Sequence, residues 1–338
     1  MNELIKPAAL CAGDTVATIS LSGGRAGDPD MIDRYHVGKK RLQDVFGLNV
    51  VETRHCLMGS DYLYRHPRAR AQDLTDALMD STVKGIISNQ GGDDAYRLLP
   101  YIDFKVIHDH PKVFIGFSDI STVHNMFTFA GVSSFYGPNL LTPIAQPSAL
   151  DSFTRDALTK ALFSREPIGV VDACKRWTPI EWRPVKSEEV AWTDNTGYEV
   201  IQGRGQARGR LLGGCCGPLQ QIMGTCLFPT EEQWKDSIVF LEIGAPYGSA
   251  LAGLHVTRAF AATGMFRHAK ALICTSVTEQ DKETVLKVLR DEEGLTELPI
   301  LCNGDFGHRT PMTVLPIGAM AEVDCENAAF TILESGVR

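Results

Sequence analysis

The stretch KVFIGFSDIST, Lys112 to Thr122, determines the fold class that we expect for this chain. A strand-like run, KVFIG (112–116), passes directly into Phe117-Ser118-Asp119 and then into a segment whose apolar residues recur at helical spacing. A buried strand that turns at once into a helix is the unit from which helix-covered parallel sheets are built. Ligands of such sheets gather at the carboxyl ends of the strands. The stretch therefore predicts an α/β fold in which Ser118 faces a crevice.

The same alternation of strand-like and helical segments extends on both sides of this corner. It predicts an N-terminal domain, residues 1–167, with a parallel, flavodoxin-like sheet that carries helices on both faces. The expected strands are TVATISL (15–21), GLNVVET (47–53), VKGIISN (83–89), KVFIG (112–116) and VSSFYG (132–137), and one expected helix is PRARAQDLTDALMD (67–80).

The pattern changes between residues 168 and 206, which are rich in Pro, Trp, Thr and charge and have no sustained period. We interpret this segment as a linker followed by a long substrate loop. Strand-like runs and helical patterns then resume, which predicts a β-rich α/β C-terminal domain over residues 207–338. Its expected strands lie within 207–214, 237–244, 269–277, 298–308 and 312–324, and its expected helices lie near 217–224, 250–264 and 280–291.

Composition excludes several classes of function. A length of 338 residues suits two domains. The formal net charge is −8 and we find no run of five basic residues, so neither a nucleic acid polymer nor a membrane surface is an expected partner. The sequence shows no signal-peptide pattern and no apolar run of about 18 residues, and we expect a cytoplasmic protein. The nine cysteines form no CxxC pair or metal-ligand spacing, so we expect reduced thiols, no metal and no cofactor.

Ser118 permits two interpretations. A serine at a strand-to-helix turn most often caps the helix. The same corner also aims the first N–H groups of the helix at the hydroxyl, which is the arrangement that acyl transfer requires. The local pattern is weaker than the G-x-S-x-G elbow of α/β-hydrolases, because Ile120 stands where the last glycine should be.

A nucleophilic serine needs a base and a carboxylate that orients it. Among the nine histidines, His308 is the one that a buried-strand run, LPILCNGDFGH, delivers into a loop. Glu242 ends another apolar strand, where a carboxylate is costly to bury without a partner. The two side chains could satisfy each other as a catalytic pair or as an ordinary salt bridge. Gly91-Gly92, which also follow a strand, could present an oxyanion N–H or form a plain turn.

These residues lie in six ordered blocks that resemble one known family. The blocks are KPAALCAGDTVATISLS, VKGIISNQGGDDAYRLLPYIDF, FIGFSDIS, GRLLGG, FLEIGAP and GDFGHRTPMTVLPIGA. They resemble the serine peptidases of the LD-carboxypeptidase and microcin C immunity (MccF) type, and they look closer to the MccF branch.

The resemblance implies a Ser-His-Glu triad of Ser118, His308 and Glu242. It also implies an oxyanion hole formed by the backbone N–H groups of Gly92 and Asp119, with Gly91 beside the substrate. The active site would lie between the two domains. The family's enzymes use no metal and are commonly dimers, so a homodimer is expected.

The substrate remains open between the two branches of the family. LD-carboxypeptidases release terminal D-alanine from a murein tetrapeptide during cell-wall recycling, whereas MccF-type enzymes cleave an amide in an aminoacyl-nucleotide conjugate and thereby give immunity. The length of the Trp-rich loop favours the second branch, and we expect Trp192 to stack on the nucleobase, although it could instead anchor the loop.

Cys215 departs from the family pattern, because many members have Asn after GRLLGG. We count it as a substrate-contacting candidate, with a buried structural thiol as the alternative. A non-catalytic small-molecule binding protein on the same scaffold is the alternative from a different class.

Overall fold

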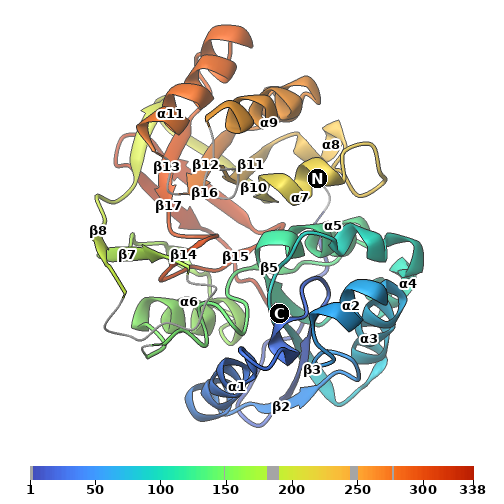
Figure 1. The fold of residues 1–338 in the computed structure, drawn as a ribbon. Coiled ribbons are helices and arrows are strands. Elements are labelled where there is room, and N and C mark those ends of the chain that lie inside the picture. The colour runs from blue at the N-terminus through green and yellow to red at the C-terminus, as the bar shows by residue number, and fades with distance from the viewer. Residues whose placement is uncertain (1–2, 148, 181–189, 244–249, 276–277) are drawn as a thin grey trace.

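The computed structural model describes residues 3–147, 149–180, 190–243, 250–275 and 278–338. Two large sheets with their helices and a small third sheet make up the described structure. In Figure 1 the N-terminal half, blue to green, lies below, and the second sheet, yellow to red, lies above it. No helix among the described residues is long and apolar enough to cross a membrane.

The first sheet has six strands in the order β15-β5-β4-β3-β1-β2. Strands β1 to β5 are mutually parallel, and β15 pairs with β5 in the antiparallel direction. The order 2-1-3-4-5 of the parallel strands is that of flavodoxin-like folds, which confirms the expected fold class. The strands are β1 (Thr15–Ile19), β2 (Asn49–Glu52), β3 (Val83–Ser88), β4 (Val113–Gly116), β5 (Phe135–Tyr136) and β15 (Leu315–Pro316).

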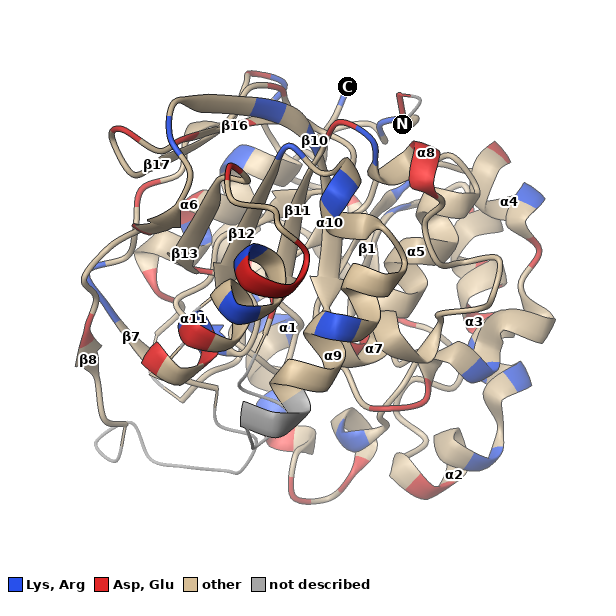
Figure 2. Ribbon diagram, turned by 90° about the horizontal axis from the view of Figure 1, so that it is seen from above, with Lys and Arg blue, Asp and Glu red and all other residues tan. Residues whose placement is uncertain are grey.

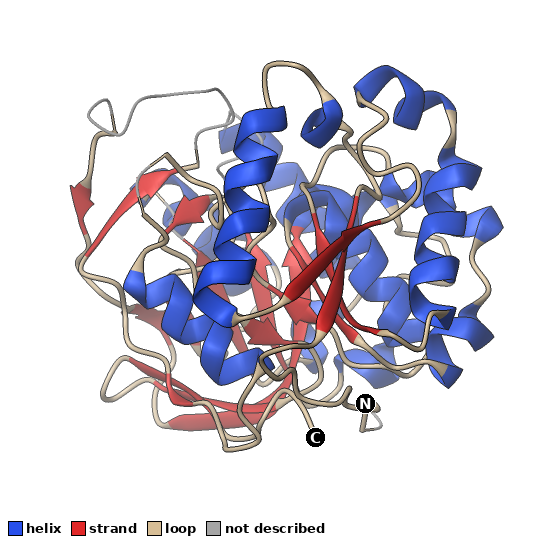
Figure 3. Cartoon of the chain, turned by 90° about the horizontal axis from the view of Figure 1, so that it is seen from below, coloured by secondary structure: helices blue, strands red, loops and turns tan. Residues whose placement is uncertain are grey.

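Helices cover both faces of this sheet (Figure 3). The reason is visible in β4, whose alternate side chains enter different apolar clusters: Phe114 belongs to one, and Val113 and Ile115 belong to the other. A strand that is buried on both faces requires a cover on both. The helical elements are η1 (Arg25–Gly27), α1 (Ile32–Phe46), α2 (Ser60–Arg65), α3 (Pro67–Met79), η2 (Ala95–Tyr101), α4 (Phe104–Asp109), η3 (Ser118–Ile120), α5 (Ser121–Phe129) and α6 (Ser152–Leu162).

The second sheet has eight strands in the order β6-β17-β16-β10-β11-β12-β13-β9. Its centre, β10 to β13, is parallel, and antiparallel strands extend it on both sides. The strands outside the 168–206 segment are β10 (Gln206–Cys215), β11 (Ser237–Glu242), β12 (Ala271–Thr275), β13 (Ile300–Gly304), β16 (Met320–Asp324) and β17 (Ala329–Ile332). The helical elements are α7 (Cys216–Gln221), α8 (Glu231–Trp234), α9 (Ala250–Ala262), α10 (Met265–His268), α11 (Glu279–Leu286) and the π-helical turn η5 (Lys287–Glu292).

The segment 168–206, interpreted from its composition as a linker and loop, contains short strands where the structure describes it. Strands β6 and β9 form the two edges of the second sheet, and β7 lies between β14 and β8 in a small third sheet. Strands of two to four residues are too short to produce a recognisable period. They are β6 (Gly169–Val170), β7 (Arg176–Pro179), β8 (Thr193–Asp194), β9 (Glu199–Gln202) and, from the C-terminal half, β14 (Arg309–Thr310).

One apolar cluster extends through both halves of the molecule and holds the two sheets together. It contains Phe117 and Tyr136 from the first half as well as Leu211, Phe240 and Phe306 from the second. The carboxyl ends of β4 and β11 therefore meet over a shared apolar core.

Charged residues of both signs are mixed along the chain: Lys and Arg are interspersed with Asp and Glu over the helices seen in Figure 2.

Candidate active site

Ser118 lies at a sharp corner between β4 and the turn η3. Its φ is +65°, a left-handed conformation that costs a non-glycine residue about 1–3 kcal/mol. Two contacts hold the corner: Phe117 N donates to Oδ1 of Asn139 (3.3 Å), and Ser118 N donates to the hydroxyl of Tyr136 (3.4 Å). Helix α5 follows at once, as the sequence predicts. A strained serine between a strand and a helix is the geometry of a nucleophile elbow.

The Gly91-Gly92 loop after β3 packs directly against this corner. A β carbon on Gly91 would lie 2.8 Å from Cβ and 3.0 Å from Oγ of Ser118, so only glycine permits the approach. The carbonyl of Gly91 accepts a hydrogen bond from Gly23 N (2.9 Å). Because a trans peptide is planar, the N–H of Gly92 points to the side opposite that carbonyl.

Asp119 ties the loops after β1, β3 and β4 together. Its buried carboxylate accepts hydrogen bonds through Oδ2 from Oγ of Ser22 (2.5 Å) and from the N–H of Ala95 (2.8 Å). Burial raises the pKa of this carboxyl, and the two hydrogen bonds only partly oppose it. The backbone N–H of Asp119 lies at the start of η3, where N–H groups have no partner within the helix.

Glu242 and His308 form a pair. Glu242 is the last residue of β11, and His308 lies in the loop that follows β13. Oε1 of Glu242 accepts hydrogen bonds from His308 N (2.6 Å) and from Nδ1 of the ring. Since an ionised carboxylate can only accept, Nδ1 carries a proton, and in the neutral ring Nε2 keeps its lone pair. Gly307 has φ +79°, and a β carbon there would lie 2.3–2.6 Å from the Glu242 carboxyl atoms. A glycine before His308 is thus required for this contact.

Tyr136, which the sequence analysis missed, completes the surroundings of Glu242. Its hydroxyl donates to Oε2 of Glu242 (2.7 Å) and accepts the Ser118 N–H. Burial, together with the Glu242 charge, raises the pKa of the phenol well above its ordinary value, so it stays a donor. The one signal in the sequence was an aromatic pair at the end of a short strand, which does not identify a partner.

The electrostatics of the pair favour the ion pair of carboxylate and imidazolium. Burial alone would raise the pKa of Glu242, but the His308 charge and the hydrogen bonds from His308 and Tyr136 outweigh it and lower that pKa. Burial alone would lower the pKa of His308, but the Glu242 charge and hydrogen bond outweigh it and raise the pKa above 6.5. The imidazole is therefore a stronger base than a free histidine.

A cavity of about 860 Å³ brings most of the sequence-predicted residues together. Ser118, Asp119 and His308 line it, and Glu242 lies behind His308 with no exposed surface. The ring of His308 packs edge-on against Phe117, the residue before the serine, with centroids 5.2 Å apart. The described lining is Gln90, Gly91, Gly92, Asp93, Ser118, Asp119, Cys215, Gly217, Pro218, Gln221 and His308.

The two remaining substrate candidates differ. Cys215 lines the cavity, and its Sγ lies within 4.8 Å of ligand atoms of both Glu242 and His308. Trp192 is not among the described residues of the lining. Its half-buried ring lies under the guanidinium of Arg176, 4.7 Å from the ring centroid. Trp182, another tryptophan of the 168–206 segment, lies outside the described residues.

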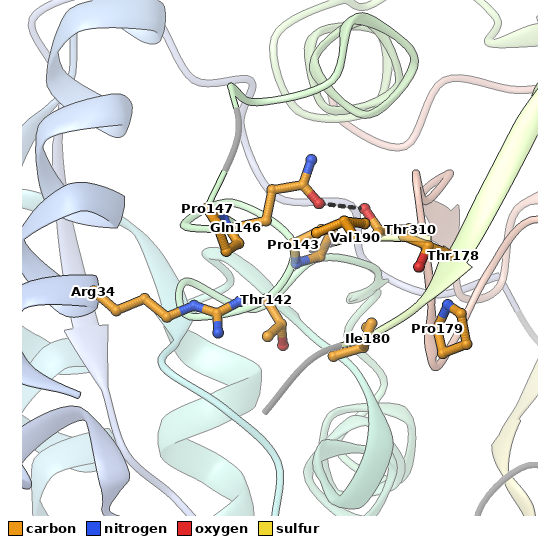
Figure 4. A pocket seen from close by; sticks show the side chains of 10 residues that line it. All are labelled: Arg34, Thr142, Pro143, Gln146, Pro147, Thr178, Pro179, Ile180, Val190 and Thr310. Atoms are coloured by element: carbon orange, nitrogen blue, oxygen red, sulfur yellow. Dashed lines mark hydrogen bonds between the residues drawn. The ribbon is translucent and has the colours of Figure 1, made fainter. Parts of the chain in front are cut away.

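A second pocket, of about 290 Å³, lies between α1, the 142–147 segment and the strands β7 and β14 (Figure 4). Oγ1 of Thr310 donates to Oε1 of Gln146 at 2.9 Å across it. Of the described residues in its lining, only Arg34 is charged, and a proline-rich wall with threonines offers no nucleophile and base pair. Of these two pockets, the one at Ser118 is the one that places a serine beside a histidine.

Two family models match most of this chain. A family model described as the LD-carboxypeptidase N-terminal domain matches residues 16–137, and one for the LD-carboxypeptidase C-terminal domain matches residues 208–323. The chain is 26% identical to the microcin C7 self-immunity protein MccF of Escherichia coli, over 97% of this chain and 95% of that protein. It is 27% identical to a Bacillus subtilis protein named "probable murein peptide carboxypeptidase", over 98% and 95% of the two chains.

Solved structures are similar over nearly the whole length. A MccF-like protein of Streptococcus pneumoniae in complex with AMP has a TM-score of 0.85 and 27% identity, covering 95% of this chain and 98% of that one. MccF in complex with glutamyl sulfamoyl guanosine has a TM-score of 0.85 at 23% identity, with 98% and 99% covered. The chain therefore belongs to the LD-carboxypeptidase family of peptidases (peptidase S66) and shares its α/β fold with the MccF-like proteins.

Proposed function

We propose that this peptidase is a serine amidase whose triad is Ser118, His308 and Glu242, and that it hydrolyses an amide in an aminoacyl-nucleotide conjugate. One observation carries the triad: Ser118 and His308 line one cavity, and the Nδ1 side of His308 is held by the buried carboxylate of Glu242. The strained φ of Ser118 supports its assignment as the nucleophile rather than as a helix cap.

In this mechanism Nε2 of His308 takes the hydroxyl proton as Oγ of Ser118 attacks the amide carbonyl carbon. The backbone N–H groups of Gly92 and Asp119 stabilise the oxyanion of the tetrahedral intermediate. His308 then gives its proton to the leaving nitrogen, the C–N bond breaks, and an acyl-enzyme remains. Water, deprotonated by the same imidazole, hydrolyses the ester and restores Ser118. Glu242 stabilises the imidazolium throughout.

The substrate class is supported by the ligands of related structures. The S. pneumoniae relative holds AMP, and MccF itself holds an aminoacyl sulfamoyl nucleoside. Trp192 stays a candidate for nucleobase stacking, with the 168–206 segment as the substrate loop. In that role its ring would have to leave Arg176 and turn toward the cavity. Such a function would give immunity to a microcin C-like compound.

A second candidate is the release of terminal D-alanine from a murein tetrapeptide. The similarity to the B. subtilis protein supports it, because that relative is as similar to this chain as MccF is. Both reactions use the same triad and differ only in the acyl and leaving groups. A non-catalytic binding protein is the third candidate, and it requires no intact triad.

The division into domains 1–167 and 207–338 remains part of the proposal, and it places the nucleophile on one domain and the other two triad residues on the second. Catalysis would then depend on how closely the domains approach. A cytoplasmic location and a homodimer also stay predictions.

The deciding experiment incubates wild type and Ser118→Ala in parallel with an aminoacyl sulfamoyl adenosine and with a murein tetrapeptide, and follows the products by mass spectrometry. Free amino acid from the nucleoside conjugate, with wild type only, supports the proposal. Loss of D-alanine from the tetrapeptide supports the second candidate. Binding without turnover of either compound by wild type supports the third, and equal turnover by Ser118→Ala would refute the serine mechanism.

Ser133→Ala is the matched control for this experiment. Ser133 is buried and donates to the carbonyl of Ile317 at 2.7 Å, and it is not among the described residues of the cavity. If turnover fell merely because a buried serine hydroxyl was removed, Ser118→Ala and Ser133→Ala would lose turnover alike. If Ser118 is the nucleophile, only Ser118→Ala loses it.

A further inference from the structure

Three side chains with metal-binding atoms meet at the active-site cavity. The Sγ of Cys215, a carboxylate oxygen of Glu242 and a ring nitrogen of His308 all lie within 4.8 Å of one another. The three residues are far apart in the sequence, so no spacing rule for metal ligands reveals them. They come from the ends of β10 and β11 and from the loop after β13, which are brought together at one edge of the second sheet.

We propose that Cys215, Glu242 and His308 form an inhibitory binding site for Zn²⁺ that regulates the peptidase by occupying its catalytic pair. A thiolate, an imidazole and a carboxylate are the three ligand types that Zn²⁺ accepts. Mg²⁺ and Ca²⁺ prefer oxygen ligands throughout, so they are excluded. The cavity in front of the cluster leaves room for water in the fourth position.

The distances are close to those of a zinc site. Tetrahedral bonds of about 2.3 Å to sulfur and about 2.1 Å to nitrogen place two ligand atoms about 3.6 Å apart. The upper limit of 4.8 Å in this cluster therefore has to shrink by about 1 Å, whereas the hydrogen-bonded Nδ1 of His308 and Oε1 of Glu242 have to move apart to admit the metal between them. On binding, the thiol proton leaves to solvent and an S–Zn bond replaces the S–H bond.

The surroundings already orient the cluster as the outer ligands of a metal site do. Tyr136 holds one oxygen of Glu242, and the Cys215 N–H donates to Oγ of Ser121 at 2.9 Å. Ser121 in turn donates to the carbonyl of Ser118 at 2.7 Å. Such outer hydrogen bonds fix ligand orientation and strengthen metal binding.

Zinc that is shared with Glu242 takes Nδ1 of His308, because the Glu242 carboxylate lies on that side of the ring. The proton that Nδ1 carried moves to Nε2, which then lacks the lone pair that must accept the Ser118 proton. Binding at Nδ1 also breaks the hydrogen bond to Glu242 that keeps the ring oriented. The inhibition is reversible, because removal of the metal restores the same side chains.

The first test measures binding without any enzymatic assay, so it does not depend on the proposed function. Co²⁺, as a coloured substitute for Zn²⁺, is added to metal-free wild type, Ser118→Ala, Cys215→Ser and Cys226→Ser. Cys226 is an exposed thiol outside the cluster and serves as the control for adventitious binding. We expect a thiolate-to-cobalt absorption band in all variants except Cys215→Ser, and competition by one equivalent of Zn²⁺. An unchanged band in Cys215→Ser would overturn the proposal.

The second test measures inhibition relative to each variant's own zinc-free rate. Zn²⁺ should inhibit wild type and Cys226→Ser, and a chelator should restore the rate. In Cys215→Ser the inhibitory concentration should rise by about 10- to 100-fold or more, since loss of even an outer hydrogen-bond partner weakens metal sites by that factor. Equal inhibition of Cys215→Ser and Cys226→Ser by Zn²⁺ would contradict the regulatory role. Zinc binding that leaves the rate of wild type unchanged would contradict it too, and neither result would bear on the serine mechanism.

Discussion

The hydroxyl of Tyr136 donates a hydrogen bond of 2.7 Å to the buried carboxylate of Glu242 and accepts one from the N–H of Ser118. A single phenol from the first sheet therefore contacts the backbone of the proposed nucleophile and the acid of the proposed triad. Because the hydrogen bonds of its hydroxyl go to the Glu242 carboxylate and to the Ser118 backbone, we regard Tyr136 as a positioning residue.

Tyr136→Phe should lower kcat by about 10- to 100-fold with little change in KM, because a hydrogen bond to a charged group contributes about 1.5–3 kcal/mol. The measurement is steady-state kinetics with a thermal-unfolding control. Tyr35→Phe is the matched control: Tyr35 is also fully buried and donates to a glutamate, Glu52, at 3.0 Å in the first half of the chain. If both variants lost activity equally, a specific role of Tyr136 would be disproved.

The pH dependence of kcat/KM follows from the raised pKa of His308. Below that pKa the imidazole is protonated and cannot accept the Ser118 proton, so activity should rise with pH through a midpoint above 6.5. In Glu242→Gln the charge and the ionic hydrogen bond that raise the pKa are lost, while burial, which lowers it, remains. The midpoint should therefore move to lower pH and the plateau should fall.

Profiles of kcat/KM against pH for wild type, Glu242→Gln and Glu52→Gln check this prediction. Glu52 accepts hydrogen bonds from Tyr35 and Lys39 in the first half of the chain, so its variant should keep the wild-type midpoint. A midpoint that stays in place in Glu242→Gln would mean that Glu242 does not set the basicity of His308, the proposed base.

Sequence patterns were informative where elements are long and uninformative where they are short. The corner at Ser118 and the strand ends at Glu242 and His308 follow from buried runs of four to six residues, whose composition fixes both burial and direction. The hydrogen bond of Tyr136 to Glu242 joins residues 106 positions apart, and nothing local encodes it. The same holds for the approach of Cys215 to His308.

The Trp-rich segment 168–206 shows why short elements are hard to predict from sequence. Its strands take their hydrogen-bond partners from distant parts of the chain: β6 pairs with β17, and β9 pairs with β13. Edge strands of this length are held by the sheet that they join and not by their own propensity. Likewise the contact between Trp192 and Arg176 depends on the pairing of β7 with β8, which the sequence pattern does not predict.

Gly307→Ala should reduce kcat/KM by about 100-fold or more, because a β carbon at this position would lie 2.3 Å from the Glu242 carboxyl carbon. The loop must then move and displace His308, and a misplacement of about 1 Å costs roughly that factor. Gly294→Ala is the control, since Gly294 also has a positive φ, +72°, but meets nothing within 4 Å. It carries the same kind of backbone strain without the clash, so wild-type kinetics in Gly307→Ala would contradict the account.

Asp305 lies just after β13, at the start of the loop that carries His308. Its buried carboxylate lies 3.0 Å from the guanidinium of Arg309 and accepts the N–H of Cys174 at 2.6 Å, and Arg309 lies over the ring of Trp177. Asp305→Asn removes the countercharge of a buried arginine, which should lower the free energy of unfolding by about 3–5 kcal/mol. Glu292→Gln breaks a partly exposed pair with Arg258 and should cost no more than about 1 kcal/mol. Denaturant unfolding of the two variants measures the difference, and equal losses would mean that the Asp305–Arg309 pair stabilises the fold no more than a surface ion pair does.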